Sequence, residues 1–481
     1  MQKIYKYTFI LATAASLVFQ SCGKEYFDEL GANPNQVNVP TLQALLATGT
    51  SKAGLRTVDA ASAINPYVQY TANPTAGAAS DIYETQDFTG TWDGMYFAMA
   101  DLNQLKKIAI EQNSSEYLGV ANLLIAYHLI IVNNFWGAAP FSEAFNPANF
   151  TPKYDTDQEI YAASMKLVDE AITELAKPTA TIKLAAASDL IHGGDRAKWL
   201  KTAYAIKARL LLKASKTPTY SAAAVLAALG NSYTTNADDA GMGTFQTRNN
   251  WASVSRSNAL LTLGGWLSEQ FIDHLNGTTY GIFDPRLPKI TDVTVVPGNA
   301  NYPKYIGTVN GAGNRLNPPH NNTVKDENYI SISSPWTSDI SPIWLVTFAE
   351  VKFIEAEAAF ATDKPRAYAA YLAGIRASML KYGLTTAESE PYVTSAIVSV
   401  GAANLTLAHI FKEKYVVTYL NPEAWNDARR HNYGYKDFGM PVNAVLPTFI
   451  RRLDYPIGER SKNGSNVPAN GLRTARLWWD L

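Results

Sequence analysis

Three glutamates within one predicted helix carry groups with which a protein can cleave a glycosidic bond. Glu350 and Glu357 are seven residues apart and share a helix face, while Glu355 lies on another. In a glycoside hydrolase, two carboxyl groups flank the bond, one as acid and the other as base or nucleophile. Glutamates on a helix also pair with Arg or Lys of neighbouring helices, and this structural role is the one that we expect here.

Other signatures of catalysis are absent from the sequence. There is no G-x-S-x-G nucleophile turn and no phosphate-binding loop, and Gly311-Ala312-Gly313 lacks the third glycine of a dinucleotide site. Asp238-Asp239 can contact a calcium ion, but two adjacent acids are more often a solvated turn. The histidines show no metal-binding spacing: His128, His192, His274, His320, His409 and His431. We therefore expect no enzyme, with no catalytic residue, no metal and no cofactor.

The composition favours carbohydrate over nucleic acid as a ligand. The formal net charge is −1, whereas a nucleic-acid surface needs clustered Lys and Arg. The chain has 27 Tyr, 18 Phe and 10 Trp, and stretches rich in Asn, Gly and Thr separate the helical segments. Aromatic rings beside polar amides suit a sugar, which presents an apolar C–H face and a rim of hydroxyls.

Residues 1–21 have the pattern of a lipoprotein signal peptide. Lys3 and Lys6 precede a short apolar run that ends at Ser21-Cys22. This run is shorter than the ~20 apolar residues that span a membrane. A small residue before a cysteine predicts cleavage there and acylation of Cys22, the only cysteine in the chain. The alternative is an ordinary signal peptide with a cysteine near the cut.

Lipid at Cys22 is the only membrane attachment that we expect. Two or more acyl chains anchor a protein stably, whereas one binds marginally. We identify no later segment that is long and apolar enough to cross a membrane. The predicted organisation is therefore a signal peptide at 1–21, a lipid-anchored tether at 22–40 and one large domain at 41–481.

The large domain is predicted to be mainly α-helical, with a scaffold at 41–230 and 344–435. Residues 231–343 are loop-rich, with a short strand at Thr291–Val296, and residues 436–481 are irregular. Several helices form apparent pairs with short links, although no strict repeat is visible. Helical periodicity predicts helices near 41–56, 92–112, 115–134, 157–176, 196–216, 221–229, 260–275, 344–361, 364–382 and 404–420.

An ordered series of motifs runs through the domain and carries a family resemblance. The motifs are Phe135–Ala144, Asp284-Pro285-Arg286-Leu287, Ser334-Pro335-Trp336, Phe348–Ala359, Tyr371–Met379, Lys412-Glu413-Lys414-Tyr415, Glu423–Arg430, Arg452–Pro456 with Glu459, and Leu477–Asp480. In this order and spacing they resemble the SusD/RagB family of outer-membrane lipoproteins, in its SusD-like branch. The resemblance spans nearly the whole mature chain.

The resemblance implies a fold, a ligand and a partner. The fold is a scaffold of four tetratricopeptide-like helix pairs with a long-loop region that carries the ligand site. The implied ligand is an oligosaccharide, and the implied partner is a SusC-like TonB-dependent transporter in the outer membrane, over which the lipoprotein lies as a lid facing the cell exterior. RagB-type relatives imply the alternative of a lid for a peptide transporter.

The charged motifs have a structural interpretation. Asp284-Pro285-Arg286 is expected to form a turn locked by its charges. Arg429 and Arg430, beside Asp427, are expected to tie the last helix to the C-terminal segment through bidentate contacts. Trp478-Trp479 is expected to pack onto the scaffold.

A glycan site needs one or two exposed ring faces and a few polar groups that bind hydroxyls. Trp266 and Trp344 are expected to be helical and buried, and are left out. For every other ring in the loops, core packing or transporter contact is an open alternative, but we expect two or three candidates to contact ligand. The candidates are Asp81, Tyr83, Trp92, Arg248, Asn250, Trp251, Tyr302, Tyr305, His320, Asn321 and Trp336.

Overall fold

The computed structural model describes residues 40–245, 247–259, 265–315, 325–469 and 472–481. The chain divides into two compact units, Met1–Thr41 and Leu42–Leu481, and the described helices and strands belong to the second. Cys22 and the predicted signal peptide lie outside the described residues.

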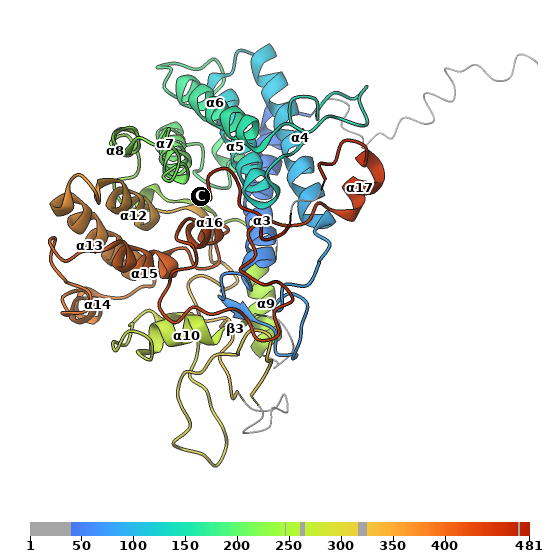
Figure 1. The fold of residues 1–481 in the computed structure, drawn as a ribbon. Helices are drawn as coiled ribbons and strands as arrows, with labels where there is room; N and C mark the ends of the chain where they lie inside the picture. Colours follow the sequence, from blue (N-terminus) through green and yellow to red (C-terminus); the bar gives the residue numbers. More distant parts are fainter. Residues whose placement is uncertain (1–39, 246, 260–264, 316–324, 470–471) are drawn as a thin grey trace, which may run out of the picture. The chain divides into compact units, whose positions relative to one another are not determined.

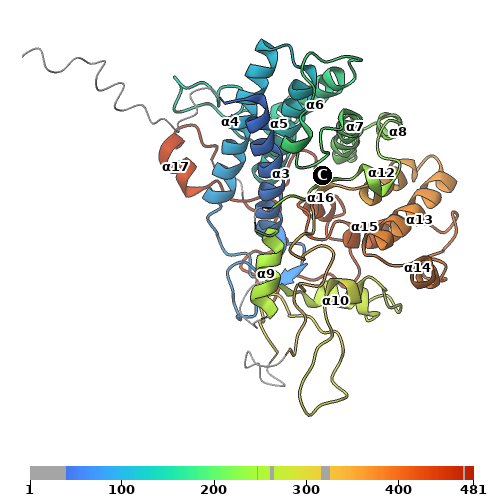
Figure 2. The same ribbon diagram turned by 180° about the vertical axis from the view of Figure 1, so that it is seen from behind.

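The first half of the large unit is a series of helices in which each packs against the next (Figures 1 and 2). Capping side chains determine where several of these helices begin. Thr156 and Glu159 form a reciprocal capping box at the start of α6, and the Asp195 carboxylate accepts two backbone N–H groups at the start of α7. The helices are α3 (Leu42–Ile64), α4 (Thr89–Glu111), α5 (Ser115–Trp136), α6 (Asp157–Leu175), α7 (Arg196–Lys213) and α8 (Ala222–Leu229).

The second half continues this stack. Helix α12 packs against α7 and α8 of the first half and against α13 and α15 of its own. The prediction of a mainly α-helical, tetratricopeptide-like fold is confirmed. The helices of this half are α12 (Phe348–Ala359), α13 (Lys364–Lys381), α14 (Thr386–Val393), α15 (Leu407–Val417) and α16 (Glu423–Arg430).

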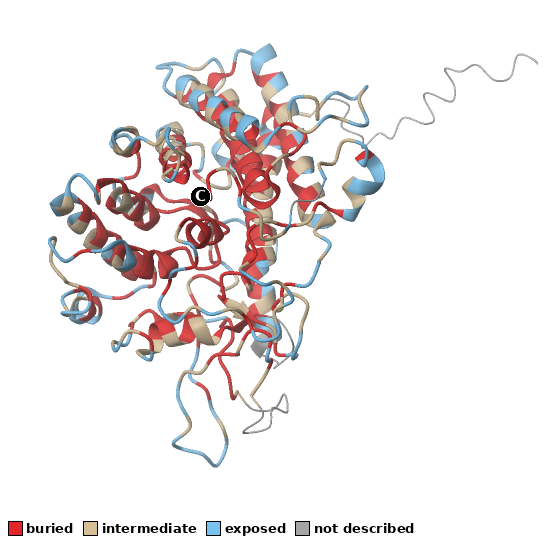
Figure 3. Cartoon of the chain, in the orientation of Figure 1, coloured by how far each residue is buried: buried red, intermediate tan, exposed pale blue. Residues whose placement is uncertain are grey.

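Helix α5 lies at the centre of the first half and corrects one expectation. Its 22 residues are long and apolar enough to cross a membrane by length and composition, although no such segment was expected. Within the protein, 94% of its most apolar stretch is buried, so α5 is a core helix (Figure 3). A Cβ on Gly119 would lie 2.5 Å from Leu175 of α6, so glycine permits this close approach of the two helices.

Two short antiparallel sheets connect distant loops, and they replace predicted helical turns. Strand β1 (Thr71–Ala72) pairs with β3 (Trp266–Leu267), and β2 (Ala240–Met242) pairs with β4 (Ile343–Val346). The helices predicted from 260 and from 344 were wrong at their starts, because a short apolar run fits a strand as well as a buried helix. Trp266 is buried as expected and Trp344 is half-buried, but both are in strands.

Several short elements lie where loops were predicted. The expected strand at Thr291–Val296 was wrong, since Val295 makes only an isolated bridge, to Lys325. Helix α10 (Glu269–Asn276) corresponds to the end of the helix predicted near 260–275. The elements in predicted loops are too short to give a periodic signal: α9 (Asn250–Ala259), α11 (Leu287–Ile290), α17 (Ile457–Asn463) and the 3-10 turns Ala186–Ser188 and Asn236–Asp238.

The expected charge lock at Asp284-Pro285-Arg286 is confirmed and is fully buried. Arg286 Nη2 lies 2.6 Å from Asp284 Oδ2 and 2.6 Å from Glu413 Oε2 on α15. Arg286 Nη1 also donates to Ser378 Oγ on α13 at 3.2 Å. The turn is therefore fixed to two scaffold helices.

Arg429 fixes the C-terminal segment to the last helix, as expected, although it does so through carbonyl oxygens rather than a bidentate ion pair. The same expectation for Arg430 was wrong, since Arg430 pairs with Glu357 of α12 and with Asp427. Arg429 Nη1 donates to the carbonyls of Asn134 and Arg451, each at 2.7 Å. Arg451 Nη1 in turn contacts both carboxylate oxygens of Asp480 at 2.7 Å. The buried Trp479 ring lies against the Arg429 guanidinium, 4.7 Å from its centroid, which confirms the predicted packing.

Candidate functional site

The three glutamates of α12 are all ion-paired, and Glu355 lies 2.8 Å from both Lys352 and Arg366. Arg209 donates to both carboxylate oxygens of Glu350, at 2.7 and 2.6 Å, in the core. Glu357 is buried between Lys414 at 2.6 Å and Arg430 at 2.9 Å. A carboxylate held in this way is already paired and is shielded from solvent, so the helix offers no free acid–base pair for glycoside cleavage.

The two adjacent aspartates also form ion pairs rather than a solvated turn. Lys201 lies 2.8 Å from Asp238, and Lys381 lies 2.5 Å from Asp239. Both aspartates are buried. Among the described residues, no group of three or more His, Cys, Asp or Glu side chains is arranged to hold a metal ion.

Two of the predicted ring contacts are core residues. Trp92 is 2% exposed and packs at right angles to Trp136, with the ring centroids 5.0 Å apart. Tyr83 is fully buried with its ring edge against Tyr67. The expectation that these rings are exposed was wrong, because the loops that carry them fold back onto the helices and leave no free ring face.

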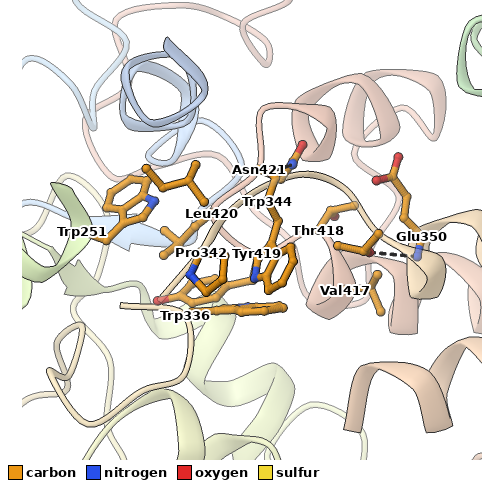
Figure 4. Close-up of a pocket in the computed structure, with 12 residues that line it drawn as sticks. Trp251, Trp336, Pro342, Trp344, Glu350, Val417, Thr418, Tyr419, Leu420 and Asn421 are labelled. Carbon is orange, nitrogen blue, oxygen red and sulfur yellow. Dashed lines mark hydrogen bonds between the residues drawn. The ribbon is translucent and has the colours of Figure 1, made fainter. Parts of the chain in front are cut away.

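Trp251 and Trp336 line a pocket that is too small for a sugar. Its volume is about 30 Å³, and Figure 4 shows the rings gathered with Trp344 and Tyr419 around it. Ligand pockets usually enclose about 300–1,000 Å³. Lys381 Nζ lies 3.2 Å from the Trp344 ring centroid, so the lysine already makes a cation–π contact with this ring. The expectation of exposed Trp251 and Trp336 rings was therefore also wrong.

Asp81 connects loops rather than facing a ligand. Its Oδ2 accepts hydrogen bonds from the Asn73 N–H at 2.8 Å, from Asn310 Nδ2 at 3.2 Å and from the Gly311 N–H at 3.3 Å. Burial raises the pKa of the Asp81 carboxyl, and these donors partly offset that shift. Asp81 thereby holds the loop at Asn73 to the loop at Asn310, which lines one of the hollows described below.

The remaining candidates lie in different places. Arg248 and Asn250 are exposed at the start of α9. Tyr302 is half-buried, and its hydroxyl donates to the Asp326 carbonyl at 3.0 Å. His320 and Asn321 lie outside the described residues. Tyr305 is half-buried and lines a hollow.

The hollow at Tyr305, which we call the ring hollow, has a volume of about 520 Å³. It is lined by Asn276, Thr278, Phe283, Val293, Lys304 and Tyr305. The Phe283 and Tyr305 rings lie 5.8 Å apart between centroids at an angle of 50°, and Phe283 is 45% exposed. Two partly open ring faces beside a carboxamide, a hydroxyl and an ammonium group can hold a sugar.

The turn after α10 positions these groups. Gly277 ends the helix with φ at +98°, a left-handed conformation that favours glycine. The Asp284 N–H then donates to the Leu275 carbonyl at 2.8 Å, which returns the chain to the helix end and sets Phe283 beside Asn276. Sequence reasoning missed Phe283. Its place immediately before the Asp284–Arg286 lock was the available signal, because a locked turn fixes the ring that precedes it.

A second hollow, which we call the acidic hollow, shares Thr278 with the ring hollow. Its volume is about 290 Å³, and its polar lining includes Gln69, Glu269, Gln270, Asp273, Thr278 and Asp437. Burial raises the pKa of Asp273, and the hydrogen bond from Asn276 Nδ2 at 3.0 Å partly offsets that shift. Carboxylates and carboxamides accept and donate hydrogen bonds to hydroxyls, so this hollow also suits a sugar.

A larger hollow on α4, α5 and α6 has a different character. Its volume is about 870 Å³, and its lining is mainly aliphatic and charged, including Ile110, Leu118 and Met165. Its only ring, Tyr161, packs at right angles to Trp478 with centroids 4.9 Å apart. It therefore lacks a pair of open ring faces.

The comparisons with known proteins agree with this fold. The chain matches the model of the SusD-like family, described as starch-binding and associating with the outer membrane, over residues 34–456. No curated protein sequence matches the chain.

Solved structures share the whole fold at low sequence identity. A SusD/RagB family protein from Bacteroides thetaiotaomicron is 20% identical, with a TM-score of 0.76 over 92% of this chain and 99% of that chain. A chitin-binding SusD homolog from Flavobacterium johnsoniae is 19% identical, with a TM-score of 0.76 over 92% and 98% of the two chains. The family model covers most of the sequence, and the chain therefore belongs to the SusD-like family of starch-binding proteins that associate with the outer membrane.

Proposed function

We propose that this protein is a surface lipoprotein that binds oligosaccharides at the outer membrane and delivers them to a SusC-like TonB-dependent transporter. The observation that carries the proposal is the pair of partly open rings, Phe283 and Tyr305, beside Asn276 and Thr278 in the ring hollow. The rings would pack on the C–H face of a sugar while the polar groups bind its hydroxyls. Tyr305 is the predicted glycan residue that we retain.

The family match and the relatives support the same ligand class. The family is described as starch-binding, and the Flavobacterium johnsoniae homolog is described as chitin-binding. The transporter partner is proposed on the family resemblance. No comparison favours the peptide-binding alternative, so peptides enter only as an outcome of the test.

Glycan binding is expected to weaken when a ring of the ring hollow is removed. Phe283→Ala and Tyr305→Ala should each weaken binding by about five- to thirtyfold, since burial of part of a ring is worth about 1–2 kcal/mol. Calorimetry with a broad oligosaccharide panel and a peptide panel, on the unlipidated mature chain carrying C22S, measures the effect.

The matched control is Phe150→Ala, because Phe150 is an exposed phenylalanine that lines neither hollow. It should leave the affinity unchanged. An unchanged glycan affinity in both ring variants would place the site elsewhere. Binding of peptides with no response to any glycan would replace the proposed ligand class.

Membrane attachment is expected to depend on Cys22. In cells, Cys22→Ser removes the thiol that is acylated, so the protein should move from the membrane fraction to the soluble fraction, because an anchor needs acyl chains. Cell fractionation checks this, and protease treatment of intact cells tests whether the wild-type protein faces the exterior. Continued membrane attachment of Cys22→Ser would show that another feature holds the protein.

A further inference from the structure

The two hollows share one lining residue, Thr278, and we call them together the groove; its two ends differ in charge. They meet at the exposed Thr278, whose N–H donates to Asn276 Oδ1 at 2.8 Å. The ring hollow has one charged lining residue, Lys304, and the acidic hollow has Glu269, Asp273 and Asp437. A chain of sugars that lies along the groove would therefore meet opposite charges at its two ends.

Two carboxylates of the acidic hollow occupy positions where their charges destabilise helix α10. Glu269 and Asp273 are four residues apart and share a face, and like charges at this spacing repel. Asp273 also lies in the last turn of α10, where the helix dipole disfavours negative charge. Neither the like-charge spacing nor the negative charge at the helix end stabilises α10. Glu269 has a partner in Arg315 and Asp273 accepts a hydrogen bond from Asn276, and a cationic ligand group would stabilise the charge that remains.

The nearest cations neutralise only part of the negative charge of the acidic hollow. Arg315 forms an ion pair with Glu269. Lys436 Nζ donates to the Thr279 carbonyl at 2.6 Å. Asp273 and Asp437 have no ion pair among the described residues, and no Lys or Arg lines the acidic hollow. Two carboxylates therefore remain available to a positively charged ligand group.

We propose that the acidic hollow is a subsite for a sugar residue with a protonated amino group, next to a neutral residue packed on the rings of Phe283 and Tyr305. This inference rests on the proposed glycan-binding function and adds the class of glycan: an amino-bearing oligosaccharide. Uronic or sulfated sugars are repelled by the carboxylates. Lys304 sets the orientation of the bound oligosaccharide, because its positive charge disfavours the amino group in the ring hollow.

The test compares three matched tetrasaccharides in calorimetry with the unlipidated mature chain: β-1,4-linked glucosamine, N-acetylglucosamine and α-1,4-linked galacturonic acid. At low salt the glucosamine oligomer should bind about five- to tenfold more tightly than the neutral one, the worth of one or two exposed ion pairs. The galacturonic acid oligomer should bind most weakly. The preference should shrink at high salt, because exposed charges are screened.

Charge-neutral variants assign the preference to the acidic hollow. Asp273→Asn retains an oxygen that accepts from Asn276, and Asp437→Asn changes an exposed residue. The double variant should bind the glucosamine and N-acetylglucosamine oligomers with equal affinity. The control is Glu390→Gln, since Glu390 pairs with Arg376 and lines neither hollow, and it should keep the preference.

The outcomes separate this inference from the proposed function. Equal affinity for charged and neutral oligomers, or tighter binding of the acidic one, overturns the amino-sugar subsite while glycan binding stands. If none of the three oligomers binds, the amino-sugar subsite is also overturned, and the broad oligosaccharide panel then decides whether another glycan class binds. A preference that persists in the double variant would place the charge recognition outside the acidic hollow.

Discussion

Replacing Arg286 by methionine is expected to lower the free energy of unfolding by about 3–5 kcal/mol, the loss typical when one member of a buried ion pair is removed. Arg286 is fully buried and neutralises Asp284 and Glu413 together. Methionine fills part of the space but leaves Asp284 without its cation and Glu413 with only Lys412, at 3.0 Å. Urea unfolding followed by helical circular dichroism measures the change.

The matched control is Arg376→Met, which removes an arginine from an exposed pair with Glu390. Surface pairs contribute little, so its unfolding midpoint should stay close to that of the wild type. Similar midpoints for the two variants would show that the Arg286 cluster is replaceable. Because Arg286 locks the turn that follows Phe283, its variant should also weaken glycan binding, which the control should not.

The Arg286 cluster shows what the sequence could predict and what it could not. The lock between Asp284 and Arg286 was predictable, because the two residues are adjacent in a turn. Glu413 was not predictable as the other partner, since it lies on α15 and the fold alone brings it within 2.6 Å. Pairing between distant elements depends on how the helices stack.

The helices and strands show the same contrast between local signals, which are predictable, and long-range pairing, which is not. The range predicted at 157–176 agrees with α6 because its apolar spacing and its capping box are local signals. The range predicted from 344 was wrong at its start because β4 exists through its pairing with β2, about a hundred residues earlier. A four-residue apolar run carries no sign of that partner.

The site was harder to predict than the fold, because ring exposure is a tertiary property. Trp92 and Phe283 both follow loops in the sequence, yet the first is buried and the second is 45% exposed. Burial of Trp92 depends on Trp136 and Tyr455, which come from α5 and the C-terminal segment. Composition indicated the ligand class, but only packing decides which rings remain open.

Replacing Glu423 by glutamine is expected to stabilise the protein above neutral pH, by about 1–3 kcal/mol. Burial raises the pKa of Glu423 to about 7, and Arg209 only partly offsets this shift. Arg209 Nε lies 4.0 Å from Glu423 but bonds directly to both oxygens of Glu350. Glu423 is therefore a buried carboxyl that shares a cation already in use.

The sign follows from comparing the folded and unfolded states. The folded pKa of about 7 is above the ordinary value of 4.5, so the folded state binds the proton more tightly. Stability from this group is greatest below about pH 4.5 and falls as the pH rises through 7. Glutamine resembles the protonated carboxyl and can still accept from Asn426 Nδ2, which now donates to Glu423 at 2.8 Å. The gain should therefore appear between pH 4.5 and 7 and be absent at pH 4.

Urea unfolding at pH 4, 6 and 8 tests this expectation, with Glu350→Gln as the control. Glu350 is the direct partner of Arg209, so its glutamine variant should destabilise the protein at pH 8 by leaving a buried arginine without its main carboxylate. If the two glutamine variants change the free energy of unfolding in opposite directions at pH 8, then Arg209 neutralises Glu350, and the charge of Glu423 destabilises the protein. A loss of stability at pH 8 in Glu423→Gln would show instead that Arg209 serves both carboxylates. The two carboxylates and Arg209 would then form one network, in which the charge of Glu423 stabilises the contact between α7 and α16.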